Sequence, residues 1–140
     1  MSKGICVMLV DDNETDNFIS KSIINLTGLA YQIVDFTSAM KAKDYLLSNS
    51  ANSANLPDLI ILDINMPIVS GIVFLYELEK IERLLCKNPA VVILSSFEQN
   101  EDTDLIVNSD RVIRYLTKPL SPELFEEIAK ELTKINLKVA

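Results

Sequence analysis

The chain has 140 residues, of which 49% are hydrophobic and 24% are charged, so we expect one globular domain with a single core. Its net charge of −7 argues against a nucleic-acid partner, because binding a phosphate backbone needs a basic face. The absence of histidine excludes Ser-His-Asp catalysis, Cys-His catalysis and histidine-ligated zinc.

The sequence contains no apolar run of membrane-spanning length, and its first apolar run is too short for a signal peptide. Cys6 and Cys86 follow no spacing typical of a metal or redox motif, so we interpret them as reduced structural thiols. We therefore expect a cytoplasmic protein without a membrane partner.

The first predicted strand is Ile5 to Val10, and it runs directly into two acidic residues. Asn13 then resembles a helix N-cap, with Asp16 three residues later. Gly28 suits the C-terminal end of this helix. The spacing predicts a core-facing stripe made of Ile19, Ile23 and Leu26.

The second predicted strand, about Gln32 to Phe36, is short and carries a charge, which favours an edge position. Ser38 is a candidate N-cap for the next helix. The apolar residues of that helix include Met40, Tyr45, Leu46 and Leu47. Ser48 to Leu56 is rich in Ser, Asn and Ala, and we interpret it as a frayed helix end followed by an exposed loop.

The third predicted strand, Leu59 to Leu62, is a continuous apolar run typical of a strand buried on both faces, and it ends at Asp63. Gly71 opens the following helix. The residues expected to form its apolar face are Val73, Phe74, Leu75, Leu78, Ile81, Leu84 and Leu85.

Two further strands are predicted at Ala90 to Leu94 and at Val112 to Leu116, with a short acidic helix between them at Glu98 to Ser109. Ser121 as N-cap, with Pro122 in the first helical position, begins the last helix. The apolar stripe of that helix is Leu124, Ile128, Leu132 and Ile135.

Five strands alternating with five helices predict a doubly wound α/β fold with a five-stranded parallel sheet of order 2-1-3-4-5, covering residues 1–140 as one domain. In this order the first and third strands are neighbours, so Asp11, Asp12 and Asp63 converge at their carboxyl ends. Three carboxylates suit a hard cation such as Mg²⁺ or Mn²⁺. The ends of the last two strands bring Ser95 and Lys118 to the same edge.

This set of side chains has a chemical interpretation. A cation relieves the repulsion between the carboxylates and can hold a phosphoryl oxygen, which leaves Asp63 as a nucleophile that forms an aspartyl-phosphate. Lys118 supplies a positive charge, and Ser95 a hydroxyl donor, for the phosphoryl group.

The chain resembles the response-regulator receiver domains of two-component signalling, whose CheY-like fold has this strand order. The resemblance rests on Val10-Asp11-Asp12-Asn13, on Leu62-Asp63-Ile64-Asn65-Met66-Pro67 with Gly71, on Leu94-Ser95-Ser96 and on Lys118-Pro119. These motifs follow the family's order along essentially the whole chain, and each stands at the end of a predicted strand.

The resemblance implies that Asp63 accepts a phosphoryl group from a phosphohistidine of a sensor histidine kinase or a histidine phosphotransfer protein. It implies Mg²⁺ held by Asp12, Asp63 and the backbone carbonyl of Asn65, with Asp11 bound through a water. Ser95 and Lys118 would then bind the phosphoryl oxygens.

The resemblance also makes Tyr115 the switch aromatic, with Ser95 as its partner in the switch, and it implies a cis Lys118–Pro119 bond. It implies a stand-alone receiver, a monomer or weak dimer, that switches a face for a downstream protein target and is not an enzyme beyond its own phosphorylation and dephosphorylation. Two features depart from the family pattern: Ser109-Asp110 replaces a usual Gly-Ala pair, and the bulky Phe97 stands two residues after Ser95.

Other interpretations stay open at this point. An intermediate phosphate shuttle in a phosphorelay would use the same site. A phosphatase of the haloacid dehalogenase type needs a second acid two residues after the nucleophile, where this chain has Asn65. A flavodoxin-like carrier needs a Ser/Thr/Gly-rich loop after the first strand, where this chain is acidic. Phe18 lies beside the helix stripe and either docks a phosphodonor helix or packs on the helix rim.

Overall fold

The computed structural model describes residues 4–63, 71–96 and 111–139, with side chains described as far as Thr133. The strands are β1 (Ile5–Val10), β2 (Ala30–Phe36), β3 (Leu59–Leu62), β4 (Ala90–Ser95) and β5 (Val112–Thr117). The helices are α1 (Glu14–Thr27), α2 (Ala39–Ser48), α3 (Gly71–Ile81) with a 3₁₀ turn at Glu82–Leu84, and α5 (Pro122–Val139). The predicted helix at Glu98 to Ser109 lies outside the described residues. No helix in the described part of the chain has the length and apolarity needed to cross a bilayer.

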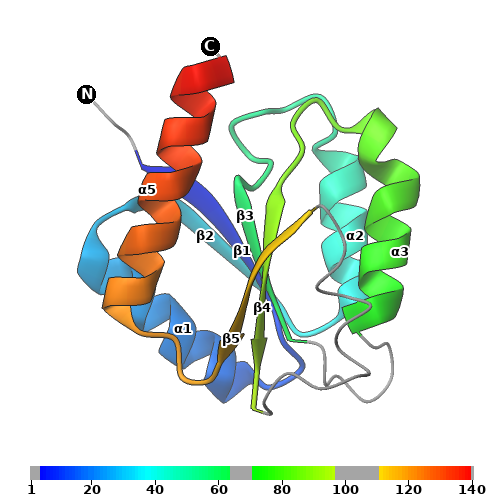
Figure 1. The fold of residues 1–140 in the computed structure, drawn as a ribbon. Helices are drawn as coiled ribbons and strands as arrows, with labels where there is room; N and C mark the ends of the chain where they lie inside the picture. Colours follow the sequence, from blue (N-terminus) through cyan, green and yellow to red (C-terminus); the bar gives the residue numbers. More distant parts are fainter. Residues whose placement is uncertain (1–3, 64–70, 97–110, 140) are drawn as a thin grey trace.

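The five strands form one parallel sheet in the order β2-β1-β3-β4-β5, which confirms the predicted topology and the edge position of β2. Helices α1 and α5 cover one face of the sheet and α2 and α3 cover the other (Figure 1). Because every strand runs the same way, all carboxyl ends meet at one edge of the sheet, where a parallel sheet presents its functional groups.

The core consists of two apolar layers, because strand residues point alternately to opposite faces of the sheet. Met8 and Val10 of β1 lie in the layer under α2 and α3, whereas Val7 and Leu9 lie in the layer under α1 and α5. Both layers are closed by a buried aromatic ring, Phe74 of α3 on one side and Phe125 of α5 on the other. The central strands are thereby fixed from both faces.

The predicted apolar stripe of α1 is wrong at two of its three residues, and only Ile23 packs against the core. Ile19 and Leu26 are 42% and 80% exposed, and the buried residues of the helix are Asn17, Ser20 and Ile24. The inward face is shifted by about one residue because the Asn17 amide donates hydrogen bonds to backbone carbonyls at the sheet edge. The ends of the helix are as predicted: Asn13 accepts a hydrogen bond from the Asp16 amide, and Gly28 adopts a left-handed conformation with φ 68°.

Three other details differ from the prediction. The helix after β3 ends at Ile81, so Leu84 lies in the 3₁₀ turn and is exposed, as is Val73 of α3. Phe125, absent from the predicted stripe of α5, is fully buried. The loop before β3 is exposed as expected except at its end, where Leu56 is fully buried. In the two helices, tertiary packing decides between neighbouring apolar residues that helical periodicity ranks equally.

Candidate functional site

The register of β1 against β3 places two carboxylates side by side. Val10 pairs with Leu62, so Asp11 and Asp63 are the next residue on each strand. The Asp63 amide donates to the Val10 carbonyl oxygen at 2.9 Å, which extends the ladder to the acid itself. Both aspartates are buried, whereas Asp12 is exposed. The predicted convergence of the two strand ends is thus present.

The turn after β1 is held by a chain of local hydrogen bonds. Oδ1 of Asp11 accepts from the backbone amide of Asn13 at 2.9 Å, and the Asn13 side chain caps α1. The buried Asn17 side chain donates from Nδ2 to the carbonyl oxygens of Asp11, at 3.1 Å, and Phe36, at 3.2 Å. These bonds fix the direction in which the acidic residues leave the strand, because buried backbone carbonyls need a partner.

Lys118 reaches the acidic residues from the end of β5. Its backbone amide donates to the Ser95 carbonyl oxygen at 2.7 Å, which ties the last residue of β4 to the turn after β5. The Lys118–Pro119 peptide bond is cis, as the resemblance implies. The lysine is therefore placed by the sheet itself and by the turn that follows it.

The Lys118 ammonium group is surrounded by carboxylates. Nζ lies 2.7 Å from Oδ2 of Asp11, 2.8 Å from Oδ2 of Asp16 and 3.6 Å from Oδ2 of Asp63. Burial alone would lower the pKa of Lys118, but the hydrogen bonds to Asp11 and Asp16 and the nearby charges outweigh it, so the pKa is raised. The side chain therefore carries a full positive charge at neutral pH.

Asp11, Asp12 and Asp63 offer one carboxylate oxygen each within 4.8 Å of one another. At such a separation two like charges repel by about 3–4 kcal/mol at an effective dielectric near 20. An all-oxygen set of this kind fits a hard divalent cation such as Mg²⁺. Asn65, whose backbone carbonyl the resemblance adds to this set, lies outside the described residues.

Ser95 and Tyr115 lie on β4 and β5, the last two strands of the sheet. Ser95 is fully buried at the end of β4 and pairs with Thr117 of β5. Tyr115 is partly buried and packs against the apolar layer under α2 and α3, beside its strand partner Ile93. The structure thus places Ser95 at the end of β4 and Tyr115 on β5, the strand that leads to Lys118, while their roles in switching stay predictions.

Asp16 is a site residue that sequence reasoning missed. Its acidic side chain was interpreted only as part of the helix start, since acids are common in the first turn of a helix. In the structure its carboxylate accepts a hydrogen bond from Lys118 at 2.8 Å, against 2.7 Å for the bond to Asp11. The sequence did offer a signal for this role. Asp16 lies in the first helical turn after the acidic end of the first strand, a position close to the same edge of the sheet.

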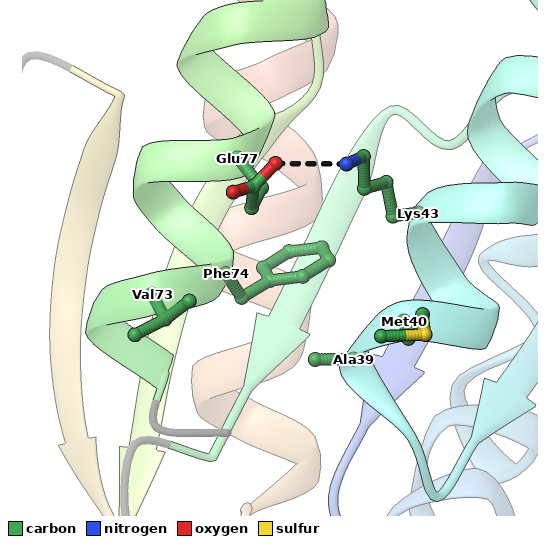
Figure 2. Close-up of a pocket in the computed structure, with 6 residues that line it drawn as sticks. All are labelled: Ala39, Met40, Lys43, Val73, Phe74 and Glu77. Atoms are coloured by element: carbon green, nitrogen blue, oxygen red, sulfur yellow. Dashed lines mark hydrogen bonds and ion pairs between the residues drawn. The ribbon is translucent and has the colours of Figure 1, made fainter.

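A separate pocket lies between α2 and α3 (Figure 2). Its lining residues are Ala39, Met40, Lys43, Val73, Phe74 and Glu77. Phe74 points between the two helices, and Lys43 donates to Glu77 across them at 2.8 Å. A volume of about 180 Å³ is small for an organic ligand. None of its lining residues belongs to the carboxylate set.

Four further residues named from the sequence can be placed or set aside. Phe18 is 69% exposed on α1, so it does not pack on the rim of the helix, and the idea that it docks a partner helix stays a prediction. Phe97, Ser109 and Asp110, the departures from the family pattern, lie outside the described residues.

Comparison with known proteins identifies the family. The model of the response regulator receiver domain matches residues 7–130. Probable methanogenesis regulatory protein FilR2 of Methanothrix harundinacea is 30% identical over 130 residues, which cover 92% of this chain and 79% of that protein. Polar-differentiation response regulator DivK of Brucella ovis is 29% identical over 124 residues, covering 89% of this chain and 92% of DivK.

Solved structures agree with the sequence relatives. A two-component response regulator from Cytophaga hutchinsonii superposes with a TM-score of 0.83 at 26% identity, over 94% of this chain and 98% of that one. The phosphorylated cyanobacterial phytochrome response regulator RcpA superposes with a TM-score of 0.66 at 29% identity, over 98% of this chain and 96% of that one. With its sheet order, its acidic strand ends and its lysine, this chain belongs to the response regulator receiver domains of two-component signalling.

Proposed function

We propose that Asp63 is the phosphoacceptor of this receiver domain and that a divalent cation, Mg²⁺ or Mn²⁺, assists the transfer. The observation that carries the proposal is the position of Asp63, a buried carboxylate at a strand end with the Lys118 ammonium 3.6 Å away and two further carboxylates converging on it. A nucleophile, a fixed positive charge and a set of cation ligands are the parts that phosphoryl transfer needs.

In the proposed reaction a carboxylate oxygen of Asp63 attacks the phosphorus of a phosphohistidine on a partner protein. The new O–P bond forms as the N–P bond breaks, and the imidazole nitrogen leaves with the electron pair and takes up a proton. Lys118 donates a charge-assisted hydrogen bond to the incoming phosphoryl group, and the Ser95 hydroxyl donates another. Asp11 and Asp12, together with Asp63, would hold the cation, which when bound neutralises charge on the phosphoryl oxygens.

The phosphodonor is proposed to be a sensor histidine kinase or a histidine phosphotransfer protein. Family membership supports this, and one curated relative, 27% identical over 92% of this chain, bears the name sensor histidine kinase CheAY of Helicobacter pylori. This chain spans only 15% of that relative, so the similarity covers a small part of it. Nothing in the comparisons supports the haloacid dehalogenase alternative, and we propose no reaction on a separate substrate.

We propose further that the phosphoryl group shifts an equilibrium between two arrangements of β4 and β5, through Ser95 and Tyr115, and so changes a face that binds a downstream protein. Tyr115 is suited to this role because it is only partly buried and can exchange its packing against the apolar layer. The two cysteines of the chain, Cys6 and Cys86, are free thiols, which suits a reducing compartment. We therefore propose that the reaction takes place in the cytoplasm.

The decisive test is labelling with acetyl phosphate in the presence of Mg²⁺, read by intact-protein mass spectrometry. The wild-type chain is expected to gain one phosphoryl group, and Asp63→Asn to gain none. Asp44→Asn, which removes an exposed carboxylate from α2, is the matched control and should label as the wild type does. Chelation of Mg²⁺ should stop labelling of both. Full labelling of Asp63→Asn would refute the assignment.

A further inference from the structure

The Lys118 ammonium group divides its hydrogen bonds unevenly among three carboxylates. It donates to Asp11 at 2.7 Å and to Asp16 at 2.8 Å, whereas Asp63 is at 3.6 Å, beyond hydrogen-bond distance. An ammonium group has three N–H donors, so two are committed away from the proposed phosphoacceptor. The closest contacts of the lysine are therefore with its neighbours and not with Asp63.

Asp16 differs from the other two partners in its position. Asp11 and Asp63 are strand-end residues and contribute to the carboxylate set with Asp12, whereas Asp16 stands in the first turn of α1. Its side chain is 34% exposed, against 10% for Asp11 and 7% for Asp63. Asp16 is not one of the three carboxylates that converge at the candidate cation site, so its contact with Lys118 is separate from that set.

We infer that Asp16 is a positioning residue that retains Lys118 in the unphosphorylated site and competes with the phosphoryl group for the lysine. The inference rests on the proposed function, because it assumes that Lys118 serves a phosphoryl group on Asp63. To do so, Nζ moves toward Asp63, and the 2.8 Å contact with Asp16 lengthens or breaks. The cost of that break slows phosphorylation, so Asp16 sets how readily this receiver accepts a phosphoryl group.

Asp16→Asn is a clean variant for the test. The helix cap uses the backbone amide of Asp16, which the substitution keeps, and the side chain keeps its size while losing its charge. Glu14→Gln removes one negative charge from the same helical turn, at an exposed residue, and serves as the matched control. Asp16→Glu restores the carboxylate and is expected to restore the wild-type behaviour in part.

Phosphorylation by acetyl phosphate and Mg²⁺ is expected to be about threefold to tenfold faster in Asp16→Asn than in the wild type, as for the loss of a partly exposed charge-assisted hydrogen bond. Glu14→Gln should stay close to the wild-type rate. A rate for Asp16→Asn that equals the control or falls below the wild type would overturn the inference.

A second measurement reads Asp16 directly and needs no phosphorylation. The side-chain NH₃⁺ resonance of Lys118, assigned by its absence in Lys118→Arg, should be protected from exchange in the wild type and in Glu14→Gln. In Asp16→Asn it should exchange several times faster. If the wild type fails to label at all, the proposed function is refuted, and this resonance still decides whether Asp16 holds the lysine. Equal protection in Asp16→Asn would overturn the inference.

Discussion

The Nζ atom of Lys118 lies 3.6 Å from Oδ2 of Asp63, and the two side chains are only 16% and 7% exposed. Because these charges are largely shielded from solvent, salt screens them weakly and the electrostatic attraction between them is strong. Asp11 and Asp16 share the same lysine. Lys118 is therefore a counterion for several acids at once, and its removal should leave them to repel one another.

Lys118→Met is expected to lower the free energy of unfolding in the absence of Mg²⁺ by about 1–3 kcal/mol, because it leaves partly buried carboxylates without their counterion. Added Mg²⁺ should stabilise this variant more than the wild type, since the cation then replaces the lost charge. Urea denaturation with and without Mg²⁺ measures both effects.

The control for that experiment is Lys43→Met, which breaks the more exposed ion pair with Glu77 between α2 and α3. Its cost should stay below about 1 kcal/mol, as for surface ion pairs, and should not depend on Mg²⁺. Equal stability of the two variants would contradict the counterion role of Lys118.

Asp12→Asn tests the candidate cation site from the other direction. In the absence of Mg²⁺ the variant should be more stable than the wild type by about 0.5–1 kcal/mol, because functional sites hold like charges together at a cost in stability. The wild type should gain about 1.4 kcal/mol at a Mg²⁺ concentration tenfold above Kd, and the variant much less. Thermal unfolding with and without Mg²⁺ gives the comparison, with Asp44→Asn expected to respond as the wild type. A full Mg²⁺ response in Asp12→Asn would exclude it as a ligand.

The two cysteines should differ sharply in reactivity. Burial raises the pKa of the Cys6 thiol to about 11 and outweighs the lowering effect of the Lys87 charge, whereas Cys86 is exposed. At about pH 8 a thiol reagent should modify Cys86 rapidly and Cys6 only after unfolding. Cys86→Ser should therefore abolish the fast reaction, and a fast reaction that survives in this variant would show that Cys6 is accessible.

The same pKa rise predicts how Cys6 contributes to stability at high pH. From the ordinary thiol value of 9.0 up to about 11, the unfolded chain loses the Cys6 proton while the folded chain keeps it. The contribution of this thiol to stability is complete below pH 9 and is lost as the pH rises through that window. Cys6→Ala should flatten the decline in unfolding free energy over the same range, as measured by urea denaturation.

The strand ends were predictable from the sequence because the chemistry changes abruptly there. An apolar run such as Leu59 to Leu62 has to be buried, and the acid that follows has to stay near water or near a counterion. With the sheet order 2-1-3-4-5, this alone brings Asp11, Asp63 and Lys118 together, as the structure confirms. Strand register converts positions far apart in the sequence into neighbours.

The face of α1 and the partner of Asp16 could not be predicted in the same way. Ile19 and Leu26 fit a helical stripe better than Asn17 does, yet Asn17 is buried because it bonds two backbone carbonyls. The position of Asp16 beside Lys118 depends on that same rotation of the helix. A hydropathy pattern does not predict such hydrogen bonds, because they form between segments that are brought together only in the folded chain.

Asn17→Ala tests how the α1 face supports the site. The substitution removes the donor to the Asp11 carbonyl oxygen and one of the donors to the Phe36 carbonyl oxygen, so it should cost about 1–3 kcal/mol of unfolding free energy. It should also weaken the Mg²⁺ response, because the turn that directs the acids loses its anchor. Asn25→Ala, on the exposed side of the same helix, uses only its backbone carbonyl at the C-cap and is the control. Urea denaturation of both variants with and without Mg²⁺ decides the matter, and equal behaviour would mean that Asn17 does not position the site.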